Sequence, residues 1–226
     1  DADYSQIELR VLAHMSGDAA LIAAYQADED IHAITASQVF DVPLDQVDST
    51  LRRKAKAVNF GIVYGISSFG LGQDLDISRK EAEGYIEKYF ATYGKVKEFL
   101  DRTVEDAKKN GYTVTMFGRR RPIPELASSN FMTRSFGERA AMNAPVQGTA
   151  ADIIKIAMIK VADALAENNM QARMLLQVHD ELIFEAPTSE IPELTALVTQ
   201  VMDSAVTLDV PMQVESHYGK TWYDAE

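Results

Sequence analysis

Residues 173–186 read RMLLQVHDELIFEA, and this stretch decides what class of fold the chain adopts. Two runs of aliphatic and aromatic residues, 173–178 and 182–186, flank the polar triplet His179-Asp180-Glu181. This pattern predicts two short strands joined by a tight hairpin turn. We expect both strands to be buried, which leaves the carboxylate of Asp180 at the tip of the hairpin.

The remainder of the chain is predicted to be mainly helical. Periodic apolar positions and capping residues predict helices at 6–15, 30–40, 50–64, 78–111 with an interruption at Gly94, 135–142, 150–165 and 191–205. The helix at 135–142 is expected to end before Pro145, and the helix at 150–165 is expected to be buried nearly all round. Residues 112–124 read as a hairpin or an irregular basic loop, and residues 212–218 as a last strand. The fold class is therefore α+β, with a small antiparallel sheet.

Composition sets limits on the kind of protein. Hydrophobic residues make up 46% of the 226 residues and charged residues 25%, which is typical of a folded protein and excludes wholesale disorder. The chain has no cysteine, so disulfides, thiolate metal sites and cysteine nucleophiles are excluded. Charged residues interrupt the longest apolar stretch, 153–166, and residues 1–4 show no signal-peptide pattern, so we expect no membrane span and no secretion signal.

The net charge of −12 argues against a polybasic nucleic-acid binder, but the basic residues are unevenly distributed. Four of them lie between residues 52 and 56, and Arg119, Arg120 and Arg121 form a second group. Local groups of this kind can bind phosphates on an acidic protein.

Two carboxylates at the ends of predicted strands, Asp3 and Asp180, are the first candidates for chemistry. Taken singly, each is most simply a turn residue. If the fold brings them together, two such charges repel by roughly 4 kcal/mol at 4 Å with an effective dielectric near 20. A divalent cation with a preference for oxygen ligands, such as Mg²⁺, removes that repulsion.

Residues 52–65 read RRKAKAVNFGIVYG and carry a stripe at i, i+4 spacing. Arg52, Lys56, Phe60 and Tyr64 share one helix face, cationic at one end and aromatic at the other. This order matches a nucleotide, with phosphates at the basic end and a base stacked at the aromatic end. A solvated basic face with Phe60 in the core explains the spacing equally well.

A second stripe at i, i+4 spacing consists of Arg139, Asn143 and Gln147. All three side chains are directional hydrogen-bond donors. The minor groove of DNA presents acceptors at similar positions for every base pair, so donors there test the shape of a pair without reading sequence. Taken alone, these residues read as a polar surface stripe.

Taken in order, these motifs resemble those of the family A DNA polymerases, the bacterial DNA polymerase I type. Residues 3–10, DYSQIELR, look like motif A of that family, residues 52–65 resemble its motif B, and Val178-His179-Asp180-Glu181 resembles its motif C. Residues 144–152, APVQGTAAD, are also similar to that family. Three motifs in this order over the whole chain make a specific resemblance.

The resemblance implies template-directed DNA synthesis, in which deoxynucleotides are transferred to a primer 3′-hydroxyl. Asp3 and Asp180 would bind two Mg²⁺ ions together with the backbone carbonyl of Tyr4. One ion would activate the primer hydroxyl, and the other would hold the triphosphate and the leaving pyrophosphate. Lys56 would be catalytic as the group that protonates the pyrophosphate.

The resemblance also implies binding roles. The incoming nucleotide would contact Gln6, Glu8, His32, Arg52, Lys56, Phe60 and Tyr64. DNA would contact Tyr64, Arg139, Asn143, Gln147 and His179. Glu8 would block a ribose 2′-hydroxyl, and it also fits a helix-capping box with Ser5. The roles of Asp1 and Glu181 stay open.

The domain organisation implied by the resemblance is a helix-rich fingers subdomain inserted in a palm. Residues 1–14 and 145–226 would belong to the palm, and residues 15–144 to the fingers. Family members carry a thumb before motif A, so we expect this chain alone to be weakly active or inactive. Primer-template DNA and deoxynucleoside triphosphates (dNTPs) are the expected partners of a monomer in the bacterial cytoplasm, associated with the nucleoid.

Three other functions stay open from the residues alone. One is a catalytically inert module that binds DNA or nucleotides. Another is a two-metal nuclease or phosphohydrolase, which would leave the stripe from Arg52 to Tyr64 unexplained. The third is a single-subunit RNA polymerase, which has similar motifs. If Glu8 excludes ribonucleotides, this residue argues against an RNA polymerase.

Overall fold

A computed structural model describes residues 1–225, which form two compact units. Unit 1 contains residues 1–7 and the chain from Thr149 onward, and unit 2 contains residues 8–148. No helix in the described part of the chain is long and apolar enough to cross a membrane. The α+β class expected from the sequence is confirmed.

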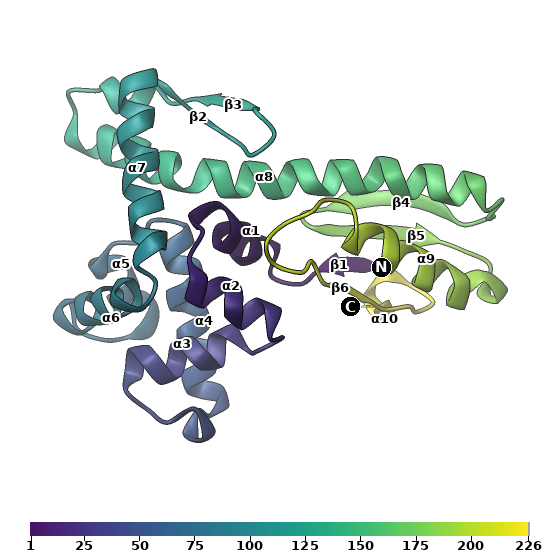
Figure 1. Ribbon diagram of the computed structural model, residues 1–226, viewed down its shortest axis with the longest axis horizontal. Coiled ribbons are helices and arrows are strands. Elements are labelled where there is room, and N and C mark those ends of the chain that lie inside the picture. Colours follow the sequence, from purple (N-terminus) through teal and green to yellow (C-terminus); the bar gives the residue numbers. More distant parts are fainter. Residues whose placement is uncertain (226) are drawn as a thin grey trace. The chain divides into compact units, whose positions relative to one another are not determined.

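Unit 1 is built on a four-stranded antiparallel sheet (Figure 1). The strands lie in the order β4 (Arg173–Val178), β5 (Glu181–Glu185), β1 (Ala2–Tyr4) and β6 (Val214–Ser216). Helix α9 (Ile191–Asp203) packs against β1 and β6 through Leu194, Val198 and Met202. The buried Tyr4 hydroxyl donates to the Met202 carbonyl at 2.7 Å, which ties β1 to the end of this helix. A short turn of 3₁₀ helix, η3 (Thr188–Glu190), precedes α9, and α10 (Trp222–Ala225) follows the sheet.

Unit 2 is mainly helical. Its elements are α1 (Ile7–Ser16, which starts in unit 1), α2 (Ala19–Gln26), α3 (Ile31–Phe40), η1 (Leu44–Gln46), α4 (Ser49–Val63), α5 (Ser68–Leu75), α6 (Arg79–Thr92), α7 (Gly94–Asn110), the hairpin β2 (Tyr112–Val114) and β3 (Arg120–Pro122), and η2 (Pro124–Ala127). The start of α8 (Phe131–Glu167) completes it. Helix α3 packs along α4, and this contact positions the candidate nucleotide-binding residues.

Short polar side chains define where these helices begin. Asp18, Asp30, Asp48, Ser67 and Ser78 each precede a helix and accept a hydrogen bond from a backbone N–H of its first turn. Such caps satisfy donors that have no partner inside the helix. The cap at Ser78 agrees with the predicted start of a helix at residue 78, and the long amphipathic segment is broken at Tyr93, immediately before Gly94.

The prediction that a helix ends before Pro145 is wrong. Helix α8 runs without a break through that residue and spans 37 residues, so the two separate helices expected at 135–142 and 150–165 are one. A proline in a helix removes one backbone hydrogen bond and costs about 3 kcal/mol. Pro145 and its neighbours Ala144 and Val146 are all buried, and this packing outweighs the local cost.

Two predictions of complete burial are also wrong. In the later part of α8 one face is buried, at residues 153, 154, 157, 161 and 165, while Ile159 is 65% exposed. In the β4–β5 hairpin, Leu182 and Ile183 of β5 are buried, but Leu175 and Leu176 of β4 are each 52% exposed. Strand β4 lies at the edge of the sheet, so one of its sides has no neighbouring strand in the described part of the chain.

Candidate active site

In unit 1 the sheet brings Asp3 and Asp180 together. Asp3 on β1 lies opposite Glu181, the first residue of β5, and the Tyr4 backbone N–H donates to the Asp180 carbonyl at 3.2 Å. The hairpin turn places His179 in the left-handed region, with φ of 51°, and leaves its side chain exposed. Two residues separated by most of the chain thus become neighbours, Asp3 on β1 and Asp180 in the turn before β5.

The charges around Asp3 oppose its ionisation. Burial raises the pKa of Asp3 to about 6, and the negative charges of Asp180, Glu181 and Glu215 add to this effect. Burial also raises the pKa of Asp180, against a hydrogen bond from its own backbone and the charge of His179. The Oδ1 atom of Asp3 is buried without a hydrogen-bond partner within residues 1–225.

This donor set fits a divalent cation. A buried carboxylate oxygen without a partner, close to further carboxylates, leaves a negative charge that a hard cation compensates. Among the described residues, no cluster of three or more His, Asp or Glu side chains forms a metal site. The proposed fit of a divalent cation therefore rests on Asp3 and Asp180. The backbone carbonyl of Tyr4 is the remaining candidate ligand from the protein.

In unit 2 the predicted stripe lies on the exposed side of α4. Arg52, Lys56 and Tyr64 are exposed and Phe60 is half-buried, whereas the core-facing positions of the helix are Ala55, Val58, Asn59, Ile62 and Val63. The Lys56 ammonium lies 5.9 Å from the centre of the Phe60 ring, and the Phe60 and Tyr64 rings stack with their centres 6.4 Å apart. The order of cation and aromatic rings is the one the sequence predicted.

Helix α3 adds His32 to this face. Its ring is buried, with its centre 6.0 Å from that of Phe60. Arg52 donates from Nε to Asp30 Oδ2 at 2.5 Å, so the residue that caps α3 also holds the arginine. Burial would raise the pKa of Asp30, but the hydrogen bonds from Arg52 and from the backbone N–H groups of Ala33 and His32 hold it below its ordinary value.

The second predicted stripe lies on α8. Arg139 and Gln147 are exposed and Asn143 is half-buried. Arg139 also lines a hollow in unit 2 together with Phe60 and Tyr64, so this stripe and the stripe on α4 meet at one place. Gly65 borders this region with φ of +66°, and a Cβ there would lie 3.1 Å from the sulfur of Met142.

The two remaining predicted nucleotide contacts come from the start of α1. Gln6 precedes the helix with φ of 55°, and Glu8 lies in its first turn; both side chains are half-buried. The roles of these two residues stay predictions.

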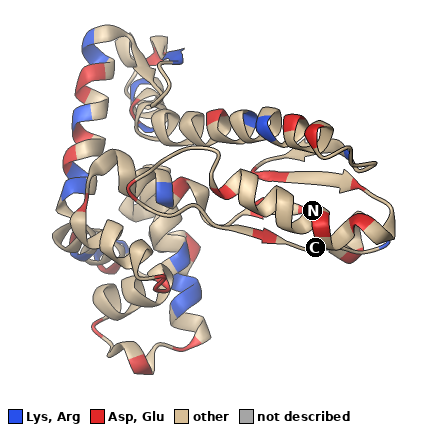
Figure 2. Cartoon of the chain, turned by 45° about the vertical axis from the view of Figure 1, so that its right-hand side comes forward, with Lys and Arg blue, Asp and Glu red and all other residues tan. Residues whose placement is uncertain are grey.

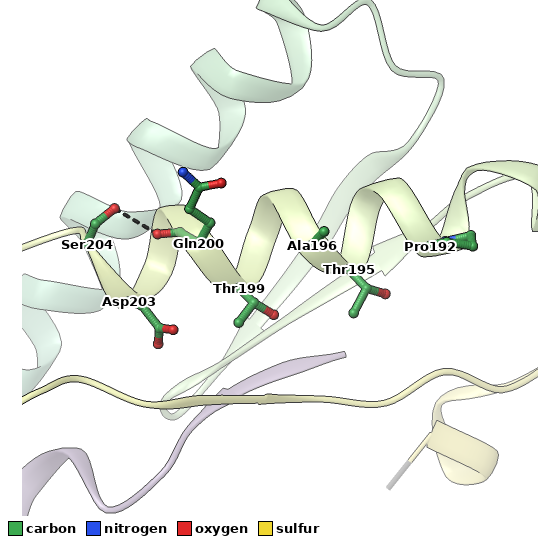
Figure 3. A pocket seen from close by; sticks show the side chains of 7 residues that line it. All are labelled: Pro192, Thr195, Ala196, Thr199, Gln200, Asp203 and Ser204. Atoms are coloured by element: carbon green, nitrogen blue, oxygen red, sulfur yellow. Dashed lines mark hydrogen bonds between the residues drawn. The ribbon is translucent and has the colours of Figure 1, made fainter.

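A separate hollow in unit 1 lies along α9 and contains none of the predicted site residues. Figure 3 shows its lining, with Asp203 as the one ionisable side chain among the seven drawn. Ser204 Oγ donates to the Gln200 carbonyl at 2.7 Å, which caps the end of the helix. We assign no chemistry to this surface.

Reasoning from the sequence missed two residues of the α3–α4 region, Asp30 and Asn59. Asp30 pairs with Arg52, and Asn59 contacts His32. The sequence did indicate that Asn59 has a buried hydrogen-bond partner, because a polar residue at a core-facing position of an amphipathic helix requires one. No signal identified that partner, which lies 27 positions earlier in the chain.

These features define an α+β protein with paired strand-end carboxylates, together with a helix face on which cations precede aromatic rings. The first set suits a divalent cation and the second a nucleotide. The class that the fold and site indicate is therefore an α+β protein with a candidate site for both.

Comparison with known proteins identifies the family. The model of DNA polymerase family A matches residues 1–224, so the chain belongs to this family. Across 225 residues, 100% of this chain, it is 57% identical to DNA polymerase I of Geobacillus stearothermophilus and 58% identical to that of Bacillus subtilis (strain 168). It covers 26% of each of these proteins, so it spans about a quarter of their length.

A solved structure agrees with this assignment. It is the POL domain of Pol1 from M. smegmatis in complex with DNA primer-template and dNTP, with a TM-score of 0.94 and 51% sequence identity. The match covers 99% of this chain and 40% of that chain. The resemblance stated from the sequence motifs is confirmed, and membership of the family implies the use of a divalent metal.

Proposed function

We propose that this chain is the part of a DNA-directed DNA polymerase that holds the catalytic metals and the incoming nucleotide. The observation that supports this most directly is the pairing of β1 with β5, which puts Asp3 beside the hairpin that carries Asp180. The reaction is template-directed addition of a deoxynucleotide to a primer 3′-hydroxyl, as the family assignment suggests. In this proposal residues 1–14 and 145–226 belong to the palm and residues 15–144 to the fingers, limits that differ by a few residues from those of the two compact units.

Asp3 and Asp180, with the Tyr4 carbonyl, would hold two Mg²⁺ ions. Bound there, the ions would supply a Lewis acid for the attacking and leaving oxygens. The protein's own contribution is a pair of carboxylates, one on β1 and one in the turn between β4 and β5, whose mutual repulsion makes cation binding favourable.

Helix α4 would bind the nucleotide along its exposed side. Arg52 and Lys56 would contact the triphosphate, and Phe60 would stack on the base or sugar. The 3′-hydroxyl would lose its proton to solvent, its oxygen would form a bond to the α-phosphorus, and the bond from that phosphorus to the bridging oxygen of the leaving pyrophosphate would break. Lys56 would then donate a proton to the departing pyrophosphate.

Gln6, Glu8 and His179 complete the proposed site. Glu8 would exclude a 2′-hydroxyl, and His179 would contact the primer end. Tyr64, Arg139, Asn143 and Gln147 would contact template and nascent pair, which is supported by the shared hollow of Tyr64 and Arg139. Primer-template DNA and dNTPs are the proposed partners of a monomer, in the cytoplasm of a bacterium.

Single-turnover primer extension with the chain in excess tests the proposal. The parent should incorporate the templated nucleotide in the presence of Mg²⁺, and Asp180→Asn should reduce incorporation below detection. Glu185→Gln, an exposed carboxylate on the same hairpin, is the matched control and should act like the parent. Incorporation that survives Asp180→Asn contradicts the proposal. Mg²⁺-dependent dNTP binding without incorporation by any variant would agree with the expectation that this chain alone is inactive, and it would leave the family assignment standing.

A further inference from the structure

Three buried side chains behind the exposed face of α4 form a hydrogen-bonded chain, which we call the His32 network. Thr35 Oγ1 donates to Asn59 Oδ1 at 3.1 Å, and Asn59 Nδ2 lies 2.8 Å from His32 Nδ1. The exposed fractions of Thr35, Asn59 and His32 are 0%, 1% and 2%. Polar groups buried this completely require defined partners, so the network permits few alternative arrangements.

The direction of these hydrogen bonds determines where the imidazole carries its proton. The amide nitrogen of Asn59 faces His32 Nδ1 at 2.8 Å, while the amide oxygen faces the Thr35 hydroxyl at 3.1 Å. An amide nitrogen only donates, so Nδ1 must accept. A neutral ring that accepts at Nδ1 holds its proton at Nε2.

The surroundings keep the ring neutral. Burial lowers the pKa of His32 to about 4, the charges of Arg52 and Lys56 act in the same direction, and Asp30 acts against them. A neutral imidazole cannot attract a phosphate by charge, so it can contribute only through an N–H donor. Asn59 engages Nδ1, so Nε2 is the ring nitrogen that the network leaves for a ligand.

We propose that Asn59, oriented by Thr35, is a positioning residue that fixes His32 as the Nε2–H tautomer, so that the neutral ring donates one hydrogen bond to the triphosphate of the incoming nucleotide. This inference rests on the proposed function, because it takes the nucleotide to lie along Arg52 and Lys56. It assigns a role to a core-facing residue of α4 that does not touch the nucleotide.

The tautomer can be measured without any catalytic activity. Long-range ¹H–¹⁵N correlation spectra of the chain resolve the ring nitrogens of its four histidines, and His32→Gln assigns the signal of His32. We expect the Nε2–H form at pH 7. Asn59→Asp replaces the donor by an acceptor and should put a proton on Nδ1, while Thr35→Ser keeps the hydroxyl and should keep the parent tautomer.

Nucleotide affinity tests whether Asn59 acts through His32. Asn59→Leu should weaken Mg²⁺-dependent dNTP binding by about tenfold, the loss of one hydrogen bond to a charged group. In a His32→Gln background the same substitution should change affinity by less than about twofold, because the interaction it supports is already absent. Val58→Ala, a neighbouring buried position outside the network, controls for general loosening of α4, and circular dichroism confirms that each variant is folded.

Three results would overturn the inference: an Nδ1–H tautomer in the parent, an unchanged affinity in Asn59→Leu, or an equal loss in both backgrounds. Failure of the proposed function gives a different result. The parent would then show the Nε2–H tautomer but no Mg²⁺-dependent dNTP binding, which removes the phosphate as the acceptor for His32.

Discussion

Asp3 occupies a position where its charge opposes folding. Its Oδ1 atom is buried without a partner in the described part of the chain, and Asp180, Glu181 and Glu215 surround it with like charge. Above pH 6 the carboxylate is ionised, and the folded state then bears the cost of desolvation and repulsion. The carboxylates proposed to hold a cation are therefore a local source of instability when no cation is bound.

Asp3→Asn should stabilise the metal-free protein at pH 7. The amide keeps the shape of the side chain and removes the charge. Because the carboxylate is partly solvated, we expect a gain of about 1 kcal/mol in the free energy of unfolding, measured by urea denaturation in EDTA. Added Mg²⁺ should raise the melting temperature of the parent and leave that of the variant unchanged. A variant less stable than the parent in EDTA would contradict this explanation.

His32 makes the free energy of unfolding depend on pH in the direction opposite to that of Asp3. Its pKa is about 4 in the folded state and near 6.5 when exposed, so the unfolded chain binds more protons between these values. Stability is therefore complete above pH 6.5 and falls as pH decreases toward 4. His32→Gln lacks this pH dependence, so between pH 7.5 and 4.5 the parent should lose up to about 3 kcal/mol more than the variant. Parallel stability curves from chemical denaturation would rule this out.

At the scale of elements, two glycines differ in how their backbone conformation affects stability. One follows helix α7 and the other lies inside helix α6. Gly111 follows the last residue of α7 with φ of 77°, and its N–H donates to the Ala107 carbonyl at 2.8 Å. Gly84 lies inside α6, where the backbone is ordinary helix. A Cβ added at either position meets nothing within 4 Å, so packing does not distinguish them.

Alanine at these two positions should therefore change stability in opposite directions. Gly111→Ala forces an L-residue into the left-handed region and should cost about 1 kcal/mol. Gly84→Ala removes the flexibility of glycine from a helix interior and should stabilise by about 0.5–1 kcal/mol. Thermal and urea unfolding of the two variants beside the parent measure both effects. A shift of the same sign in both would mean that backbone conformation is not the cause.

At the scale of the whole molecule, the net charge of −12 repels DNA, so binding depends on local basic groups. Several lysine and arginine side chains already form ion pairs with acidic side chains. Blue and red segments alternate along α7 in Figure 2, where Lys95 pairs with Glu98 and Lys97 with Asp101. Arg139 instead donates to the neutral Ser135 hydroxyl at 3.1 Å and forms no ion pair with a described residue, although it lines one hollow with Tyr64 and Asp74.

Salt dependence should separate these two kinds of cation. Primer-template affinity should fall as salt concentration rises, and Arg139→Gln should reduce the slope of log affinity against log salt by about 1. Lys97→Gln makes the same change in net charge at an ion pair on α7 and should leave the slope unaltered. Fluorescence anisotropy over a salt series measures both. Equal slopes for the parent and Arg139→Gln would show that Arg139 does not neutralise a DNA phosphate.

Local sequence determined most of the secondary structure and the chemistry of the candidate residues. The caps at Asp30 and Ser78, the stop at Gly111, the hairpin around Asp180 and the exposed stripe on α4 all follow from interactions within a few residues of each other. The family was also identifiable, because motifs in a fixed order are a property of the chain itself.

Only the tertiary structure decided how these parts are used. The approach of Asp3 to Asp180, the link from Asn59 to His32 and the continuation of α8 through Pro145 each depend on packing between segments far apart in the chain. The exposure of Leu175 and Leu176 likewise depends on which strands surround β4. Propensity and periodicity act over a few residues, whereas burial and register are set by the whole fold, so local patterns reveal the residues and the fold decides their partners.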